Sequence, residues 1–176
     1  MNIGTQYKSD DEFKAEARLY QSKYRASFLN VEFQDYGNRL TDSDAEALLN
    51  YYDKLNARES LRKRYPSYSR KRDADLLRSE HIPFNLLAPL NTNREAAIQI
   101  ISKAWNIECV EIQMIEIEYA PAPKVNYLND GTAFDSYIKA TLKNGKSCGI
   151  GIEVKYTEQA YPVGKTESMN VKNHEL

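Results

Sequence analysis

The sequence predicts an α+β fold, with one globular domain and an N-terminal helical extension. Apolar residues recur at helical spacing before residue 105, and the alternation of apolar and polar residues that is typical of strands begins near residue 108. Of the 176 residues, 41% are hydrophobic, which is enough to bury a core. We expect residues 1–72 to form the helical extension with a basic connector, and residues 73–176 to form the core.

The composition narrows the classes of protein that fit. The formal net charge is −1, so no overall field attracts nucleic acid. Cys109 and Cys148 are too few for a disulfide framework and are expected to pack as small apolar residues. No apolar run reaches transmembrane length and the N-terminus lacks a signal-peptide core, so we expect a cytoplasmic protein with no membrane partner. The thirteen tyrosines could stack on bases, but packing is their more common use.

Two helices are predicted in the first third of the chain. Ser9 and Glu12 form a capping-box pattern that opens a helix ending at about Leu29. Thr41 can cap a second, longer helix, which Pro66 would stop. The expected inner residues of the first helix are Phe13, Leu19, Tyr20 and Tyr24, and those of the second are Ala45, Leu48, Leu49, Tyr52 and Leu55.

A basic run of eleven residues follows, with six Lys or Arg and two tyrosines between them. One interpretation is a solvated loop between helices. The other is a surface that contacts nucleic-acid phosphates. The candidate residues for such contacts are Arg62, Lys63, Arg64, Arg70, Lys71 and Arg72.

A third helix is predicted from about Asp73 to His81, ending before Pro83. Glu80 would lie in its last turn, where the helix dipole disfavours an acid, so a metal ion or a basic partner would explain its position. His81 could be a ligand or a base. We expect it instead to be a hydrogen-bonded structural residue, the more common role of a lone histidine beside a helix end.

Another capping box, Thr92 with Glu95, opens a helix to about Trp105. Its expected inner residues are Ala97, Ile98, Ile101, Ala104 and Trp105. A strand follows from about Glu108 to Tyr119, and its alternation changes phase at Met114–Ile115, which predicts a bulge. The next residues, up to position 131, are rich in turn formers, and an Asn-Asp-Gly turn accounts for Asp130 without a metal.

The segment from Phe134 to Lys155 is predicted to be a β-hairpin. Its even positions are mostly apolar: Phe134, Ser136, Ile138, Ala140 and Leu142 on the first strand, and Cys148, Ile150, Ile152 and Val154 on the second. A two-residue Asn-Gly turn would pair even positions with odd ones. A three-residue loop with Gly145 in the left-handed conformation pairs even with even, so we predict that loop because one face must be buried.

This register places Asp135 directly opposite Glu153, with Lys155 on the same face. Opposed carboxylates repel each other, and a divalent cation such as Mg²⁺, which takes oxygen ligands, would remove that penalty. Gly149 and Gly151 are expected to leave the face open to a substrate backbone. The alternative for a Glu-x-Lys pattern in a strand is a solvated face with an ion pair.

An acid followed, after seventeen residues, by Glu-x-Lys across a hairpin resembles the active site of the PD-(D/E)XK nuclease superfamily. Phe134 stands where the motif has proline. A second resemblance, to a bacterial group of proposed restriction endonucleases in that superfamily, covers roughly residues 20–160. The matching segments are Tyr36–Thr41, Ser79–Leu87 and Glu153–Glu158.

The resemblance implies a restriction-endonuclease-like core: a mixed β-sheet flanked by helices, with an antiparallel hairpin that carries the site. That core normally adds a helix and a strand after its first three strands. Neither is predicted after Lys155, where about twenty residues remain. The chain is therefore expected to be either a truncated piece or a form with a reduced C-terminus.

The resemblance also implies a metal-dependent endonuclease that hydrolyses phosphodiester bonds in DNA. Asp135, Glu153 and the Val154 carbonyl would hold one or two Mg²⁺ ions, or Mn²⁺. Lys155 would orient or deprotonate water or neutralise the transition state, and Glu80 would serve a second ion. A homodimer is possible.

Two other functions stay open at this point. One is an inactive nucleic-acid-binding or assembly module on the same fold. The other is a structural α+β domain, in which Asp135 and Glu153 should lie far apart or be neutralised by arginines.

Overall fold

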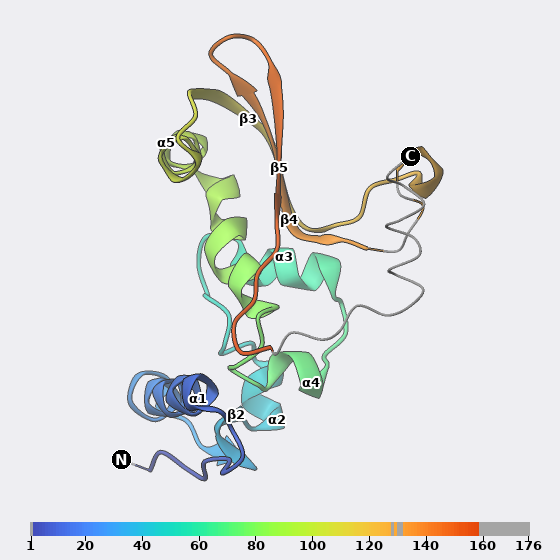
Figure 1. The fold of residues 1–176 in the computed structure, drawn as a ribbon. Helices are drawn as coiled ribbons and strands as arrows, with labels where there is room; N and C mark the ends of the chain where they lie inside the picture. Colours follow the sequence, from blue (N-terminus) through green and yellow to red (C-terminus); the bar gives the residue numbers. More distant parts are fainter. Residues whose placement is uncertain (1, 128, 130–131, 159–176) are drawn as a thin grey trace.

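The computed structural model describes residues 2–127, 129 and 132–158. The fold is α+β, with a helical N-terminal part and a three-stranded sheet (Figure 1). The helical elements are α1 (Glu12–Tyr24), η1 (Arg25–Leu29), α2 (Asp42–Glu46), α3 (Ala57–Arg64), α4 (Arg70–Asp73), η2 (Pro83–Leu87), η3 (Ala88–Thr92), α5 (Arg94–Trp105) and η4 (Lys124–Asn126). The strands are β1 (Phe33–Gln34), β2 (Tyr36–Leu40), β3 (Cys109–Tyr119), β4 (Phe134–Leu142) and β5 (Ser147–Ile152).

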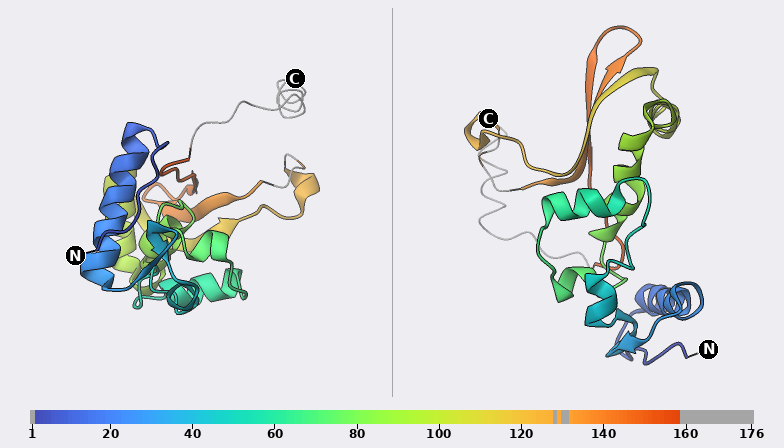
Figure 2. Two further views of the ribbon diagram at one scale, coloured as in Figure 1. Left: turned by 90° about the horizontal axis from the view of Figure 1, so that it is seen from below. Right: turned by 180° about the vertical axis from the view of Figure 1, so that it is seen from behind.

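The main sheet is an antiparallel meander in the order β3-β4-β5, and β1 pairs with β2 in a separate ribbon. Every strand pairing in the described part of the chain is antiparallel, so the parallel strand of a mixed sheet is not seen there. The connection between β3 and β4, which contains η4, extends away from the helices in all views (Figures 1 and 2).

The predicted hairpin register is confirmed. Ser136 pairs with Ile152 and Ile138 with Ile150, so even positions face even positions. Leu142 donates its N–H to the Lys146 carbonyl at 2.9 Å, which leaves a loop of three residues, 143–145, inside this last pair. Gly145 in it has a φ of 79° and donates its N–H to the Leu142 carbonyl at 2.8 Å. A side chain is disfavoured at that φ, which is why the glycine is placed there.

The main core lies between α5 and the sheet. Ala97 and Ile101 of α5 pack on the buried even face of the hairpin, whereas Trp105, expected to point inward, is largely exposed. The buried members of this cluster are Ala97, Ile101, Cys109, Ile112, Ile115, Ile138, Ala140 and Ile150. Ile112 and Ile115 are both buried because the register shifts between Ile112 and Met114. The predicted bulge is thus present, close to the predicted position.

The predicted second helix is wrong as a single element. Thr41 caps α2 as expected, but the chain leaves the helix at Leu48, which has a φ of 59°, and α3 begins only after Asn56. The physical reason is the burial of Tyr51, which is 1% exposed and donates a hydrogen bond to Asp73 at 3.1 Å. A continuous helix would have buried Tyr52 instead, and that side chain is exposed.

The inner face of the first helix was predicted correctly only in part, because Leu19 and Tyr24 are half-buried but the other two candidates are not. Phe13 and Tyr20 are exposed, and the buried residues include Arg18 and Arg25. Arg18 donates to Asn38 at 2.6 Å, and Arg25 donates to backbone carbonyls, so these buried polar groups have partners. The helix nevertheless continues through η1 to Leu29, as predicted.

Both predicted capping boxes are off by one or two residues. Asp11, not Ser9, caps α1 by accepting the N–H of Lys14, and Asn93, not Thr92, caps α5 by accepting the N–H of Ala96. In each case a short Asx side chain reaches the third backbone N–H of the helix. The helix content is therefore correct and only the start shifts.

The third predicted helix does not form over Asp73–His81. One helical turn, α4, ends at Asp73, and turns and a bridge between Asp75 and Arg39 follow. The Asp75 carboxylate accepts the N–H of Leu77 at 3.1 Å, a local bond that competes with helix formation. Glu80 therefore lies in a turn before η2.

Both cysteines, Cys109 and Cys148, are free thiols. Among the described residues, no helix has both the length and the apolar character needed to cross a membrane. Asp130 and the segment after Glu158 lie outside the described residues, and the division of the chain near Asp73 stays a prediction.

Candidate active site

Asp135, at the start of β4, lies at the centre of the candidate site. Its carboxylate is half-buried and accepts the backbone N–H of Val154 at 2.6 Å. The strand pairing ends with Ser136 and Ile152, one pair before Asp135 and Glu153 would face each other. Beyond the last strand pair, the hydrogen bond from the Val154 N–H to Asp135 keeps the two chain segments together and holds Glu153–Lys155 beside Asp135.

Burial raises the pKa of Asp135, the Val154 N–H opposes this, and the charge of Glu153 raises it further. The charge of Lys155 lowers the pKa of Asp135, but the net shift is upward, and the ion pair that the described residues show at these two acids is with Lys155, not with an arginine. If the domain were purely structural, Asp135 and Glu153 should lie far apart or be neutralised by arginines. The charge of Glu153 acts on Asp135, so the two predicted metal ligands are not far apart.

Glu118 is a fourth acid at this site that the sequence reasoning missed. Strand β3 pairs Ile117 with Ser136 and Tyr119 with Phe134, which sets Glu118 opposite Asp135. Burial raises the pKa of Glu118, the hydrogen bond from the Tyr65 hydroxyl lowers it, and the charge of Asp135 raises it. In the sequence, Glu118 is visible only as an acid near the end of a predicted strand. Its pairing with Asp135 could not be derived, because the bulges in β3 shift the register of the strand.

The backbone at Glu118 is unusual as well. Its φ of 57° is left-handed, which non-glycine residues adopt rarely and at a cost of about 1–3 kcal/mol. A strained residue next to a second acid with a raised pKa is a pattern enriched at functional sites.

Lys155 forms an ion pair with Glu153, and both side chains are more than half exposed. An exposed pair of this kind stabilises a fold little. The hydrogen bond to Glu153 raises the pKa of Lys155 and the charge of Asp135 raises it further, although partial desolvation acts in the opposite direction. The lysine is therefore a cation at neutral pH, placed beside Asp135.

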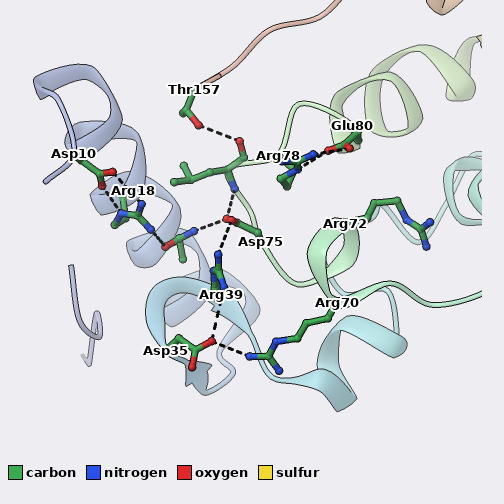
Figure 3. A network of polar contacts seen from close by, with 12 residues as sticks. Asp10, Arg18, Asp35, Arg39, Arg70, Arg72, Asp75, Arg78, Glu80 and Thr157 are labelled. Carbon is green, nitrogen blue, oxygen red and sulfur yellow. Dashed lines mark hydrogen bonds and ion pairs between the residues drawn. The ribbon is translucent and has the colours of Figure 1, made fainter. Parts of the chain in front are cut away.

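Glu80 has the basic partner that its position called for. Arg78 binds it through two hydrogen bonds of 2.6 and 2.7 Å (Figure 3). Partial burial raises the pKa of Glu80, but the bonds and charge of Arg78 outweigh it and the net shift is downward. The charge of Glu80 still reaches Asp135 and Glu118, so Glu80 lies at the margin of the acid cluster.

His81 is buried and its Nε2 lies 2.5 Å from the Arg72 carbonyl oxygen. Asn50 contacts the same ring nitrogen at 3.1 Å. Burial lowers the pKa of His81, so the ring is neutral. These contacts describe the structural role that was expected.

The chain after β5 is fastened to the loop that carries Glu80. Thr157 donates its hydroxyl to the Leu77 carbonyl at 3.3 Å (Figure 3), and Glu158 accepts the N–H of Ser79 at 3.0 Å. Although burial raises the pKa of Glu158, hydrogen bonds from backbone N–H groups and Ser79 lower it to about 2. This clamp fixes the course of Glu153–Lys155 from its far end.

The basic run divides into two parts. Arg70 binds Asp35 and Asp42 at 2.8 and 2.7 Å, and Arg72 binds Asp73 at 2.7 Å, so these two guanidiniums serve the fold (Figure 3 shows the pair of Arg70 with Asp35). The end of α3 differs, because Arg62, Lys63 and Arg64 are exposed there. The charge of Arg64 reaches Glu118, which places this basic end beside the acids.

The expectation that Gly149 and Gly151 leave the face open is wrong. A Cβ on Gly149 would lie 2.3 Å from the Tyr137 hydroxyl oxygen, and one on Gly151 would lie 2.7 Å from the Phe134 ring. The glycines make room for aromatic rings of the neighbouring strand, an arrangement known from other sheets.

The donor set suits a hard divalent cation in part. No cluster of three or more His, Cys, Asp or Glu side chains tight enough to hold an ion occurs in the part of the chain that the structure describes. Mg²⁺, however, commonly takes only one or two carboxylates and completes its shell with water and phosphate. Asp135 with Glu153 or Glu118 provides such carboxylates. A cation would offset both the burial and the repulsion from Glu153 that raise the pKa of Asp135.

A family model described as the PD-(D/E)XK nuclease superfamily matches residues 8–175. The chain belongs to the PD-(D/E)XK nuclease superfamily. Membership indicates a nuclease, in a superfamily whose members typically use divalent metal ions. Searches of curated proteins and of solved structures gave no significant match.

Proposed function

We propose that this PD-(D/E)XK protein is a metal-dependent endonuclease that hydrolyses phosphodiester bonds in DNA. The observation that carries the proposal is the bond between Asp135 and the Val154 N–H, which draws the acid and the Glu-x-Lys segment of the superfamily motif together. The repulsion among these carboxylates supports a site built for a cation rather than a solvated strand face.

Asp135 and Glu153 would hold one or two Mg²⁺ or Mn²⁺ ions, together with the Val154 carbonyl. Glu118 is available as a further oxygen donor, and Glu80 would act on a second ion or on its water shell. A bound divalent ion lowers the pKa of a coordinated water and stabilises negative charge on the phosphate.

Lys155 would neutralise the charge that grows on the phosphate, or orient the attacking water. Its raised pKa favours these roles over proton abstraction, because a base must be unprotonated at the working pH. The exposed basic end of α3 would contact the phosphates of the same strand, since Arg64 acts electrostatically on Glu118.

The alternative is a catalytically inactive nucleic-acid-binding or interaction module on the same fold. The absence of a three-residue metal cluster in the described residues favours it. Against it, an inactive module has no need to keep repelling acids and a strained Glu118 together.

The experiment is cleavage of a supercoiled plasmid with Mg²⁺ or Mn²⁺, compared with EDTA, for wild type and Glu153→Ala. Glu108→Ala is the matched control, because Glu108 is also an exposed acid in an ion pair, here with Lys143 at the far end of the hairpin. We expect metal-dependent cleavage by wild type and control only. DNA binding without cleavage in the presence of either metal would favour the inactive module. Cleavage by Glu153→Ala at the wild-type rate would refute the proposed site.

A further inference from the structure

A pocket of about 430 Å³ adjoins the acid cluster and has Glu153 in its wall. Its volume falls in the range of small-molecule sites. The residues of the wall that matter here are Tyr119, Lys124, Tyr127, Phe134, Tyr137 and Glu153. We call this the aromatic pocket.

The rings of the aromatic pocket offer flat faces rather than a packed interior. Tyr119 and Tyr137 stack with centroids 4.6 Å apart and planes 18° apart, and Phe134 lies 6.1 Å from Tyr137 at 30°. Phe134 is 41% exposed and Tyr127 is 56% exposed. Tyr119 and Tyr137 cover one face of each other, so the exposed rings of Phe134 and Tyr127 are the ones on which another flat ring could stack.

Covering the sheet glycines explains only part of this arrangement. Tyr137 lies over Gly149 and Phe134 over Gly151, which accounts for one side of each ring. It does not account for Tyr127, which comes from the β3–β4 connection, or for the hollow itself.

The position and charge of the aromatic pocket favour one kind of flat ring. Glu153 is part of the pocket wall and its charge acts on Asp135, so a group in the pocket and a group at the acids would be neighbours along a ligand. Lys124 adds a cation to the wall. Nucleic acid has this combination, with a base and a phosphate in each repeating unit, and bases stack on aromatic side chains with little regard to sequence.

We propose that the aromatic pocket binds an unpaired nucleobase of the DNA strand whose phosphate lies at Asp135. A paired base inside a duplex cannot reach such a pocket unless it leaves the stack, which costs a few kcal/mol and costs least where pairing is already absent. The preferred substrate class is then DNA with single-stranded or mispaired positions at the cleavage point. This inference rests on the proposed nuclease function.

The test measures binding without cleavage. Fluorescence anisotropy in EDTA or Ca²⁺ compares a blunt duplex, the same duplex with unpaired nucleotides, and a single strand, each with 2-aminopurine at one position. We expect wild type to prefer the unpaired probes and to quench 2-aminopurine at the unpaired position, as stacking on a ring does.

Tyr127→Ala and Phe134→Ala should each weaken binding of the unpaired probes roughly 5- to 150-fold, the range of one base stack, and leave duplex binding unchanged. Phe134→Tyr should restore it, since the ring remains. Trp105→Ala removes a comparably exposed ring on α5 and is the control. Thermal melts establish that each variant is folded.

The outcomes separate this inference from the proposed function. The proposed role of the aromatic pocket would be refuted if wild type cleaved plasmid but bound all probes alike, or if the variants lost affinity for every probe equally. The nuclease proposal would stand in both cases. If binding of the unpaired probes depended on the rings but no metal supported cleavage, the aromatic pocket would stand and the nuclease proposal would fail. No binding of any probe would refute the nucleobase as occupant.

Discussion

Replacing Glu118 by glutamine is expected to stabilise the protein and impair its function at once. Glutamine keeps the size of the side chain and an oxygen that can accept the Tyr65 hydroxyl bond, and it removes one of two opposed charges. Because the folded-state pKa of Glu118 and of Asp135 is raised, their ionisation destabilises the fold as the pH rises through those values. The gain from Glu118→Gln should therefore be absent in acid and present at alkaline pH.

The strand register sets the size of this gain. Residues directly opposite in an antiparallel pair have Cβ atoms about 5 Å apart. Two unit charges at that distance repel by about 3 kcal/mol at an effective dielectric constant of about 20, and by about 1 kcal/mol in water. Both groups are half-buried, so we expect about 1–3 kcal/mol, or a rise in Tm of roughly 2–10 °C for a chain of this length.

The assay is thermal unfolding with EDTA across mildly acidic to mildly alkaline pH. Glu116→Gln is the control, because Glu116 is exposed on the same strand and faces Tyr137, not an acid. Its Tm should match wild type at every pH. A Glu118→Gln variant that melts at or below wild type at alkaline pH would refute the idea that the two carboxylates oppose each other.

Three further predictions concern the site and its surroundings. Asp135→Ala should lose both Mg²⁺ binding, measured by calorimetry, and cleavage. Lys155→Ala should bind Mg²⁺ as well as wild type or better, but its single-turnover cleavage rate should fall by about 10²-fold or more. A normal rate for Lys155→Ala would show that Lys155 is an ordinary surface lysine. Alanine at Arg62, Lys63 and Arg64 should weaken DNA binding by a similar factor for all sequences. The dependence of log affinity on log salt concentration should become less steep, by about one for each phosphate that is no longer neutralised. An unchanged slope would mean that the end of α3 is a solvated surface without DNA contacts. Glu158→Gln should lower Tm at neutral pH by an amount that shrinks as the pH falls from about 4.5 to about 2, because the lowered pKa of Glu158 contributes stability only above that window; a difference independent of pH would contradict the clamp.

The hairpin could be predicted from the sequence because two local facts determine it. Strand side chains alternate with a period of two, and Gly145 fits the one loop that keeps both apolar sets on one face. The placement of Asp135 near Glu153 follows from that register. Where periodicity and turn chemistry agree, as from α5 to β5, the elements appear where expected.

The misplaced elements depend on distant contacts. The break at Leu48 exists because Tyr51 is buried against Asp73, and the polar inner face of α1 exists because Arg18 finds Asn38. Neither partner is visible in a local window. Glu118 was missed for a related reason, since two bulges in β3 shift its register before the strand reaches Asp135.

The bond from the Val154 N–H to Asp135 gives the protein a built-in spectroscopic reporter. An amide that donates to a carboxylate senses each change on that carboxylate, so protonation of Asp135 or capture of its oxygens by a cation would alter the Val154 proton resonance and its exchange with solvent. Val154 supplies no side-chain chemistry of its own. Its single amide signal could nonetheless follow the state of Asp135 in solution, with no substrate present.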